Sequence, residues 1–436
     1  MKSGDNGMEL EKLNVFIEIN GVNQLVGNIS GILSGNAVFT YTDEYISNPD
    51  SRPISISLPL EEKSFDSKRT KNFFDGLLPE GFTRTCVAHW MHKEESDYIS
   101  ILHGLGRECL GAIRIMGTQD EEIRSDYRRM TPDEVKKLAQ EGARESAELV
   151  TKSHLSLTGA SGKVGLYYDV KNDEWYLPLG NAPSTHIVKQ SHVRLKNIVA
   201  NEQLCLLMAK ELGIEIPESF IVKTDGRNNE DVLFATGRYD RKFTSHPGKL
   251  NGLSVPYRLH QEDFSQALGI PSSQKYEQNG GDYLKRMFAI LQNYSASPME
   301  DQLKLWKICI FNYLIGNTDN HIKNQSLLYS EDLKRIRLAP AYDIVSTMIY
   351  DSSTENMALG INGIYRITDI SREDFEEEAV HVGLGKKFAM QHFDAMVSGF
   401  KAAMETARES LEAQGFEVGS ICHAICEKGG IHHFYF

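Results

Sequence analysis

The sequence predicts a two-lobed α+β fold with a sheet-rich N-terminal half and an all-helical C-terminal lobe. Before Gln261, short segments alternate apolar and polar residues, as half-buried strands do. After Gln261, longer segments carry apolar residues at helical spacing. The length of 436 residues gives room for two or three domains with a large core.

The first module is predicted over residues 10–118. Alternating strands are expected within 13–42 and 54–60, a helix over 84–106 and a closing strand from Leu110. A charged stretch over 119–150 follows. Thr131-Pro-Asp-Glu is typical of a helix start, so this stretch is predicted to be a linker helix.

The second half of the sheet-rich region is predicted over residues 151–258, as a small sheet with one helix at 201–212. Its expected strands are 155–158, 164–168, 175–178, 186–190, 219–223 and 232–239. The helical lobe is predicted over 259–436. One of its helices, 303–316, ends at Gly316, a common helix stop.

Composition and charge exclude several classes of protein. A net charge of −13 opposes nonspecific nucleic-acid binding, and no apolar run reaches transmembrane length. The first residues lack a signal-peptide core, and six scattered cysteines are typical of free thiols in a reducing cytosol. The segment Cys422-His-Ala-Ile-Cys426, followed by His432 and His433, could bind zinc. Its loose spacing fits one face of a helix better.

The stretch Asn317-Thr-Asp-Asn-His-Ile-Lys-Asn324 carries the strongest chemical signal. Asp319 and Asn324 have the spacing Asp-x-x-x-x-Asn, and Asp343 follows in Pro-Ala-Tyr-Asp-Ile. Protein kinases space a base Asp, a metal-binding Asn and a metal-binding Asp in this way. Asn and Asp are also ordinary turn residues, so the stretch alone fits a polar turn equally well.

Two further features fit phosphate binding. Ser156-Leu-Thr-Gly-Ala-Ser-Gly-Lys-Val-Gly-Leu166 joins two predicted strands, and its glycines let backbone N–H groups approach an anion. A flexible hairpin is the alternative. Lys189 ends a strand and Glu202 opens the next helix, an arrangement that kinases use to hold phosphates. An ordinary surface lysine and a first-turn helix acid are the alternatives there.

The order of these signals favours a bilobal protein-kinase-like fold, because chance agreement in residue type, spacing and order together is rare. The chain also resembles the HipA family of bacterial serine/threonine kinase toxins. Characteristic stretches include Asn72-Phe-Phe-Asp-Gly-Leu-Leu-Pro79 and Arg238-Tyr-Asp-Arg241. The other matching stretches are 52–60, 106–112, 185–189, 201–213, 259–263, 316–324 and 340–344. The resemblance implies a full-length form that includes the N-terminal module.

The resemblance implies a role for each matching residue. Asp319 would be the catalytic base, with His321 supporting it, and Asn324 and Asp343 would bind Mg²⁺. Ser156 would be the autophosphorylation site, where added charge would repel ATP and switch the enzyme off. The residues implied in ATP binding are Lys189, Ser161, Gly162, Lys163, Arg238 and Tyr239.

The resemblance also implies a cytoplasmic protein and its partners. These are a HipB-like helix-turn-helix antitoxin, DNA bound only through that antitoxin, and a protein substrate such as an aminoacyl-tRNA synthetase. No membrane partner is expected. Two positions depart from the family: Gly237 replaces an acidic hinge residue, and Ser161 adds a second phosphorylatable serine. The alternatives are a catalytically impaired co-repressor that binds the antitoxin, and a kinase of a small molecule.

Overall fold

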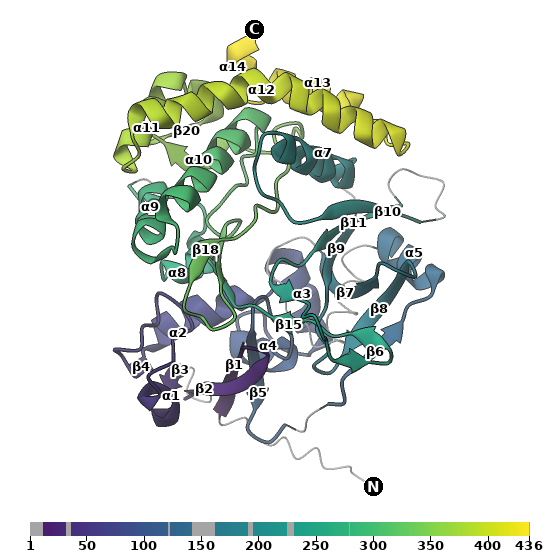
Figure 1. Cartoon of the computed structure of the whole chain (residues 1–436), viewed down its shortest axis with the longest axis vertical. Coiled ribbons are helices and arrows are strands. Elements are labelled where there is room, and N and C mark those ends of the chain that lie inside the picture. The colour runs from purple at the N-terminus through teal and green to yellow at the C-terminus, as the bar shows by residue number, and fades with distance from the viewer. Residues whose placement is uncertain are drawn as a thin grey trace.

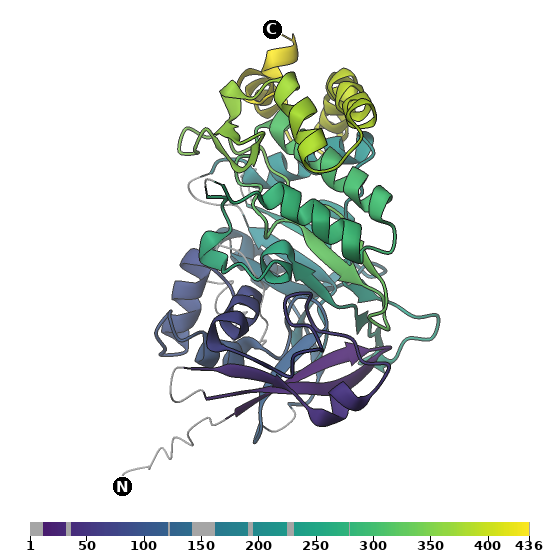
Figure 2. The ribbon, with the colours of Figure 1, turned by 90° about the vertical axis from the view of Figure 1, so that its left-hand side faces the viewer.

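The computed structural model describes residues 12–31, 36–120, 123–141, 162–190, 195–224, 231–278 and 280–435. The C-terminal helices form the top of the molecule (Figure 1). Below them the N-terminal module lies on the left and a second sheet lies on the right. The view turned by 90° also shows the helices above, with the first sheet below (Figure 2).

The N-terminal module is an antiparallel sheet covered by short helices. Its strand order is β4-β3-β2-β1-β5, and β1 alternates buried and half-buried residues as the sequence predicts. The strands are β1 (Lys12–Ile19), β2 (Val22–Ser30), β3 (Val38–Tyr41), β4 (Ser64–Phe65) and β5 (Ile113–Gly117). The helices are α1 (Asp43–Ser47), α2 (Ser67–Phe74), α3 (Gly81–Trp90) and α4 (Tyr98–Leu105).

The second sheet has six strands in the order β10-β11-β9-β7-β8-β6. They are β6 (Asp126–Arg129), β7 (Lys163–Asp169), β8 (Glu174–Leu179), β9 (His186–Gln190), β10 (Ser219–Lys223) and β11 (Val232–Gly237). Helix α7 (Ile198–Glu211) packs beside β10 and β11. The range 119–150, expected to be a linker helix, contributes both the edge strand β6 and α5 (Pro132–Glu141), which packs on β9 and β11.

The C-terminal part is built mainly of helices. They are α8 (Phe264–Ala267), α9 (Tyr283–Tyr294), α10 (Pro298–Ile315), α11 (Arg372–His381), α12 (Lys386–Ala413), α13 (Gly419–Lys428) and α14 (His432–Tyr435). The predicted stop at Gly316 is confirmed, because this residue caps α10 with a left-handed φ of 71°. No described helix has both the length and the apolar composition needed to cross a membrane.

Small antiparallel sheets interrupt the lobe that the sequence predicts to be all-helical. They are formed by β16 (Gln261–Asp263), β17 (Ser326–Tyr329) and β18 (Ile336–Leu338), and by β19 (Asn356–Ile361) and β20 (Ile364–Arg366). Such strands of three to six residues are too short for a clear periodic signal. Hairpin strands between the two parts are β12 (Arg241–Lys242), β13 (Lys249–Leu250), β14 (Leu253–Ser254) and β15 (Tyr257–Arg258).

The apolar core links the first and last parts of the chain. One cluster of buried side chains runs from Leu13 and Phe39 in the N-terminal module to Trp306 and Phe400 in the C-terminal helices. The second sheet has a separate core that includes Val164, Trp175 and Leu233. The N-terminal module therefore packs as a continuation of the helical part, and not as an appended domain.

Candidate active site

A pocket opens between the second sheet and the helical part. Lys163, Lys189 and Phe234 line it from the sheet, and Gly237 to Asp240 line it from the chain that leaves β11. From the helical part come His321, Asn324, Tyr342 and Asp343, and the N-terminal module adds Glu80 and Leu110. All three parts of the chain thus contribute to one site.

Lys189 lies at the centre of this site on β9, which runs between β7 and β11. Its Nζ donates to Glu202 Oε1 of α7 at 2.5 Å and also to Asp343 Oδ1. Burial opposes the charged form, but Asp343 and Glu202 outweigh it, so the pKa of Lys189 lies above its usual value. The predicted pairing of a strand lysine with a helix glutamate is present.

Asp343 connects this lysine to a second one. Its Oδ2 accepts a hydrogen bond of 2.9 Å from Lys163 Nζ at the start of β7. Burial would raise the pKa of Asp343, but Lys163 and Lys189 hold it well below its usual range. The backbone here has a left-handed φ of 54°. Asp343 therefore presents an ionised carboxylate between two ammonium groups.

The loop after α10 is fixed by its own backbone. Asp319 N donates to Asn317 Oδ1 at 3.1 Å, and Asn324 N donates to the His321 carbonyl at 2.8 Å. The Asn324 side-chain amide donates to the Asp319 carbonyl at 2.9 Å. Because its N–H₂ is engaged there, Asn324 can offer its amide oxygen to a cation in the pocket.

Asp319 is exposed and does not line the pocket, but the charges of Lys163 and Asp343, which do line it, reach its carboxylate. The hydroxyl of Tyr276 donates to Asp319 Oδ1 at 2.6 Å and fixes its orientation. Desolvation by the surrounding groups raises the pKa of Asp319, and the Tyr276 hydrogen bond partly offsets this. A carboxylate so held can accept a proton from a hydroxyl group that approaches from solvent.

His321 lies beside it and is buried. Its ring meets the Tyr276 ring edge-on, with 5.2 Å between the centroids. Burial lowers the pKa of His321 to about 3, so the imidazole is neutral at physiological pH. Its Nδ1 is buried and has no hydrogen-bond partner among the described residues. A neutral ring nitrogen therefore remains for a ligand or a water molecule.

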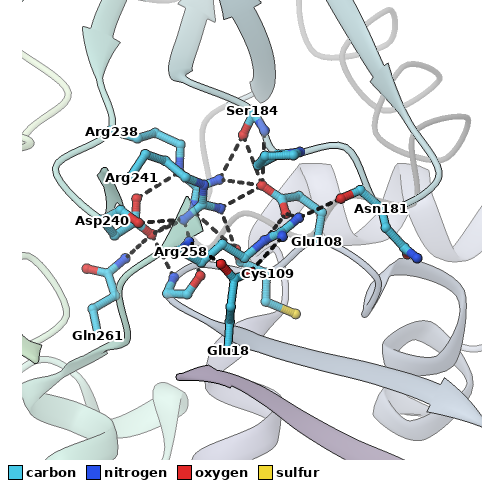
Figure 3. Close-up of polar contacts among 12 residues, drawn as sticks. Glu18, Glu108, Cys109, Asn181, Ser184, Arg238, Asp240, Arg241, Arg258 and Gln261 are labelled. Carbon is cyan, nitrogen blue, oxygen red and sulfur yellow. Dashed lines mark hydrogen bonds and ion pairs between the residues drawn. The ribbon is translucent and has the colours of Figure 1, made fainter. Parts of the chain in front are cut away.

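The chain that leaves β11 passes the other end of the pocket. The Arg238 guanidinium is fully buried in an ion cluster (Figure 3), although the residue lines the pocket. Tyr239 donates through its hydroxyl to Gln261, and its ring lies 5.9 Å from that of Tyr342. At Gly237, an added Cβ would meet only Glu218 at 3.6 Å or more, so the fold does not require glycine there.

The ion cluster was not predicted from the sequence. Three arginines, Arg238, Arg241 and Arg258, face three acids, Glu18, Glu108 and Asp240 (Figure 3). Glu18 and Glu108 belong to the N-terminal module. The residues of the ion cluster lie up to 240 positions apart along the chain, so no local sequence pattern could have indicated their contact. The cluster ties the module to the segment that follows β11.

The remaining predicted residues fall in two groups. Ser156 and Ser161 lie outside the described residues. Gly162 and Lys163 lie at the start of β7, with Gly162 buried and Lys163 in the pocket.

The six cysteines are free, and Cys422 and Cys426 lie one turn apart on α13. In the described part of the chain, no group of three or more His, Cys, Asp or Glu side chains could hold a metal ion.

The polar side chains of the pocket fit magnesium and a nucleoside triphosphate. Magnesium prefers oxygen ligands, and the Asp343 carboxylate and the Asn324 amide oxygen supply them. Lys163 and Lys189 are held where they can bind phosphate oxygens. Because each Asp343 oxygen is already neutralised by an ammonium group, a divalent cation there would replace an existing positive charge and not create a new charge pair.

Comparison with known proteins identifies the family. The model of the HipA-like C-terminal domain matches residues 155–404, and that of the HipA N-terminal domain matches residues 17–116. Putative kinase Y4mE of Sinorhizobium fredii is 29% identical over 409 residues, 92% of this chain and 93% of that protein. The serine/threonine-protein kinase toxin HipA of Shewanella oneidensis is 26% identical over 322 residues, 71% of this chain and 70% of that protein.

A solved structure confirms the predicted fold class. A chain of the complex of HipA, HipB and operator DNA from Shewanella oneidensis MR-1 matches with a TM-score of 0.78. Sequence identity is 22%, and the match covers 97% of each chain. The two-lobed, kinase-like α+β arrangement is therefore shared over nearly the whole length. With both HipA domains matched in order, the chain belongs to the HipA family of kinases.

Proposed function

We propose that this chain is an ATP- and Mg²⁺-dependent serine/threonine protein kinase. The observation that carries the proposal is the convergence of Glu202 and Asp343 on the Lys189 ammonium, which lines the pocket between the sheet and the helical part. A lysine held between a helix glutamate and a metal-type aspartate is the arrangement that orients nucleotide phosphates in kinases.

Each residue has a distinct part in phosphate transfer. Lys189 and Lys163 bind and orient the phosphates, and Asn324 and Asp343 would hold Mg²⁺, which supplies charge neutralisation when bound. Asp319 orients the acceptor hydroxyl and accepts its proton. Phosphoryl transfer needs little covalent help from the protein, so positioning and electrostatic stabilisation account for the catalysis.

The biological role proposed is that of a growth-inhibiting toxin. The resemblance to HipA supports a protein acceptor such as an aminoacyl-tRNA synthetase and neutralisation by a HipB-like antitoxin. The Shewanella HipA was solved with HipB and operator DNA, which supports a similar partner and DNA contact through that partner here. A net charge of −13 agrees with DNA contact that depends on another protein.

Autophosphorylation of the segment before β7 is part of the proposal. Ser156 is seven residues before Lys163, and Lys163 binds Asp343 in the site. A phosphate adds close to two negative charges, which would compete for the lysines that bind ATP. Mass spectrometry of the purified chain tests this step, since it detects phosphate on Ser156 or Ser161.

The proposed activity is tested by Asp319→Ala. We expect the variant to transfer no detectable label from ATP to protein while it still binds ATP and keeps the wild-type melting temperature. The matched control is Asp351→Ala, which removes an exposed carboxylate that pairs with Lys428 at 2.9 Å outside the pocket. Full transfer by Asp319→Ala would remove the proposed mechanism.

A second candidate is a HipA-like binding protein that no longer transfers phosphate. Gly237 favours it, because this pocket residue offers no side chain where the family has an acid. Calorimetry with ATP and Mg²⁺ separates the two functions, since the binding protein would give no heat of nucleotide binding. Label that enters small molecules and no protein band would instead indicate a small-molecule kinase.

A further inference from the structure

The N-terminal module contributes a charged side chain to the candidate active site. Glu80 immediately precedes α3, and it lines the pocket together with residues of the loop 317–324, called the catalytic-type loop below. Its Oε2 accepts a hydrogen bond of 2.7 Å from Lys275 Nζ, and its Oε1 lies 3.2 Å from Lys323 Nζ. Glu80 thus bridges two lysines that come from a different part of the chain.

The two lysines differ in how fully they are engaged. Lys323 is only 3% exposed and contacts the Glu80 and Asp263 carboxylates, the Gly76 carbonyl and the Ser272 hydroxyl. Lys275 is 13% exposed, lines the pocket and has Glu80 as its single carboxylate partner among the described residues. Lys275 therefore keeps donors for a ligand, whereas Lys323 is a structural anchor.

Lys275 is placed at the loop end of the pocket. The backbone N–H of Ile322, within the catalytic-type loop, approaches the Lys275 carbonyl at 3.5 Å. The next residue, Tyr276, donates to Asp319. Lys275 lowers the pKa of both Asp319 and His321, which shows that its charge reaches both side chains. Lys189 approaches the same pocket from the sheet side.

We propose that Lys275 is a catalytic residue that contacts the transferred phosphoryl group, and that Glu80 is the positioning residue that holds it there. This inference rests on the proposed kinase function. In phosphoryl transfer, charge spreads over the oxygens of the moving group as it leaves the nucleotide for the acceptor. A cation fixed near the base Asp319 stabilises that charge on the acceptor side, whereas Lys189 enters the pocket from the sheet.

The Glu80 carboxylate is needed to keep Lys275 in place. Lysine has a flexible four-carbon stem, and an unpaired ammonium would move toward solvent. Burial favours neutral Glu80, but Lys323 and Lys275 outweigh it and hold the pKa of Glu80 at about 2. Glu80 is therefore ionised at physiological pH and acts as a fixed anchor for Lys275.

The test is Lys275→Gln, with Lys304→Gln as the matched control. Lys304 also pairs with a glutamate, Glu215 at 2.8 Å, but does not line the pocket. We expect Lys275→Gln to lower kcat about 10- to 100-fold and to weaken ATP binding, while the affinity for ADP changes less than about twofold. Lys275→Arg should restore part of kcat because it keeps the charge.

The role of Glu80 is tested by Glu80→Gln. The variant should show the same selective loss of ATP over ADP affinity, and Glu80→Asp should recover part of it. A purely structural role would not change this selectivity. Unchanged kcat and ATP affinity in Lys275→Gln would overturn the inference, and so would equal losses for ATP and ADP. If the unaltered chain transfers no phosphate, the kinase proposal fails, while the ATP and ADP affinities still decide the role of Lys275.

Discussion

The buried ion cluster gives a quantitative prediction for Glu108→Gln. Glu108 Oε1 accepts from Arg241 at 2.6 Å and from Arg238 at 3.3 Å, and Oε2 accepts from Arg258 Nε at 2.7 Å. Its side chain is 2% exposed. The substitution keeps the shape of the side chain but removes a charge and turns an amide N–H₂ toward guanidinium donors.

The loss of stability in Glu108→Gln follows from the charges that remain in the cluster. Three buried arginines would face only Glu18 and Asp240, so one positive charge would lack a partner within the cluster. Removing one partner of a buried ion pair typically costs about 3–5 kcal/mol. The matched control is Glu331→Gln, whose partner Lys242 is half exposed, and it should cost less than about 1 kcal/mol.

Urea unfolding measures the difference between these two variants. We expect the transition of Glu108→Gln at pH 7 to shift to clearly lower urea, while Glu331→Gln unfolds close to wild type. Coincident transitions for the two variants would refute the reasoning, because they would show that the cluster contributes no more than a surface pair.

The pH dependence supplies an independent check. Burial would raise the pKa of Glu108, but Arg241, Arg258 and Arg238 hold it well below its ordinary value of 4.5. The stability that Glu108 contributes is therefore complete above pH 4.5 and is lost as the pH falls below it. The stability gap between wild type and Glu108→Gln should narrow from pH 7 to pH 4, and a constant gap would contradict this account.

Two predictions concern the active site itself. Lys189→Met should weaken MgATP binding at least about tenfold by calorimetry, because it leaves Glu202 and Asp343 without their shared cation. Tyr276→Phe should move the acidic limb of the kcat–pH profile to higher pH. Asp319 acts as a base only when ionised, and Tyr276 donates the hydrogen bond that lowers its pKa. His321, with a pKa of about 3, contributes no limb between pH 5 and 9. An unshifted limb in Tyr276→Phe would show that a group other than Asp319 controls it.

The sequence predicted well what depends on residues close together in the chain. The loop from Asn317 to Asn324 is held by hydrogen bonds among its own members, so the spacing of its residues carries its geometry. Lys189 and Glu202 lie 13 residues apart on a strand and the next helix, which is also a local arrangement. The structure places both groups around the pocket, while their roles in catalysis stay predictions.

What the sequence could not predict depends on contacts between distant segments. Glu80 meets Lys275 across 195 residues, and Glu18 meets Arg258 across 240. Periodicity cannot signal such contacts, because each acid and base alone is typical of a solvent-exposed residue. Arg238 illustrates the difference. The resemblance to the HipA family implied a nucleotide contact for Arg238, whereas its guanidinium binds Glu108 and Asp240 of the buried cluster.

The contacts of the N-terminal module constrain how the site can open. On one side the module binds the segment after β11 through Glu108 and through the Gly111 N–H, which donates to Asp240 at 2.7 Å. On the other side it binds the helical part through Ser55, which donates to Glu262 at 2.5 Å, and through Glu80. A rotation that widens the pocket must break one of these two groups of contacts, and breaking a buried charged pair costs about 3–5 kcal/mol. Because the module spans both sides of the pocket, it fixes the distance between Lys189 and the loop that carries Asp319.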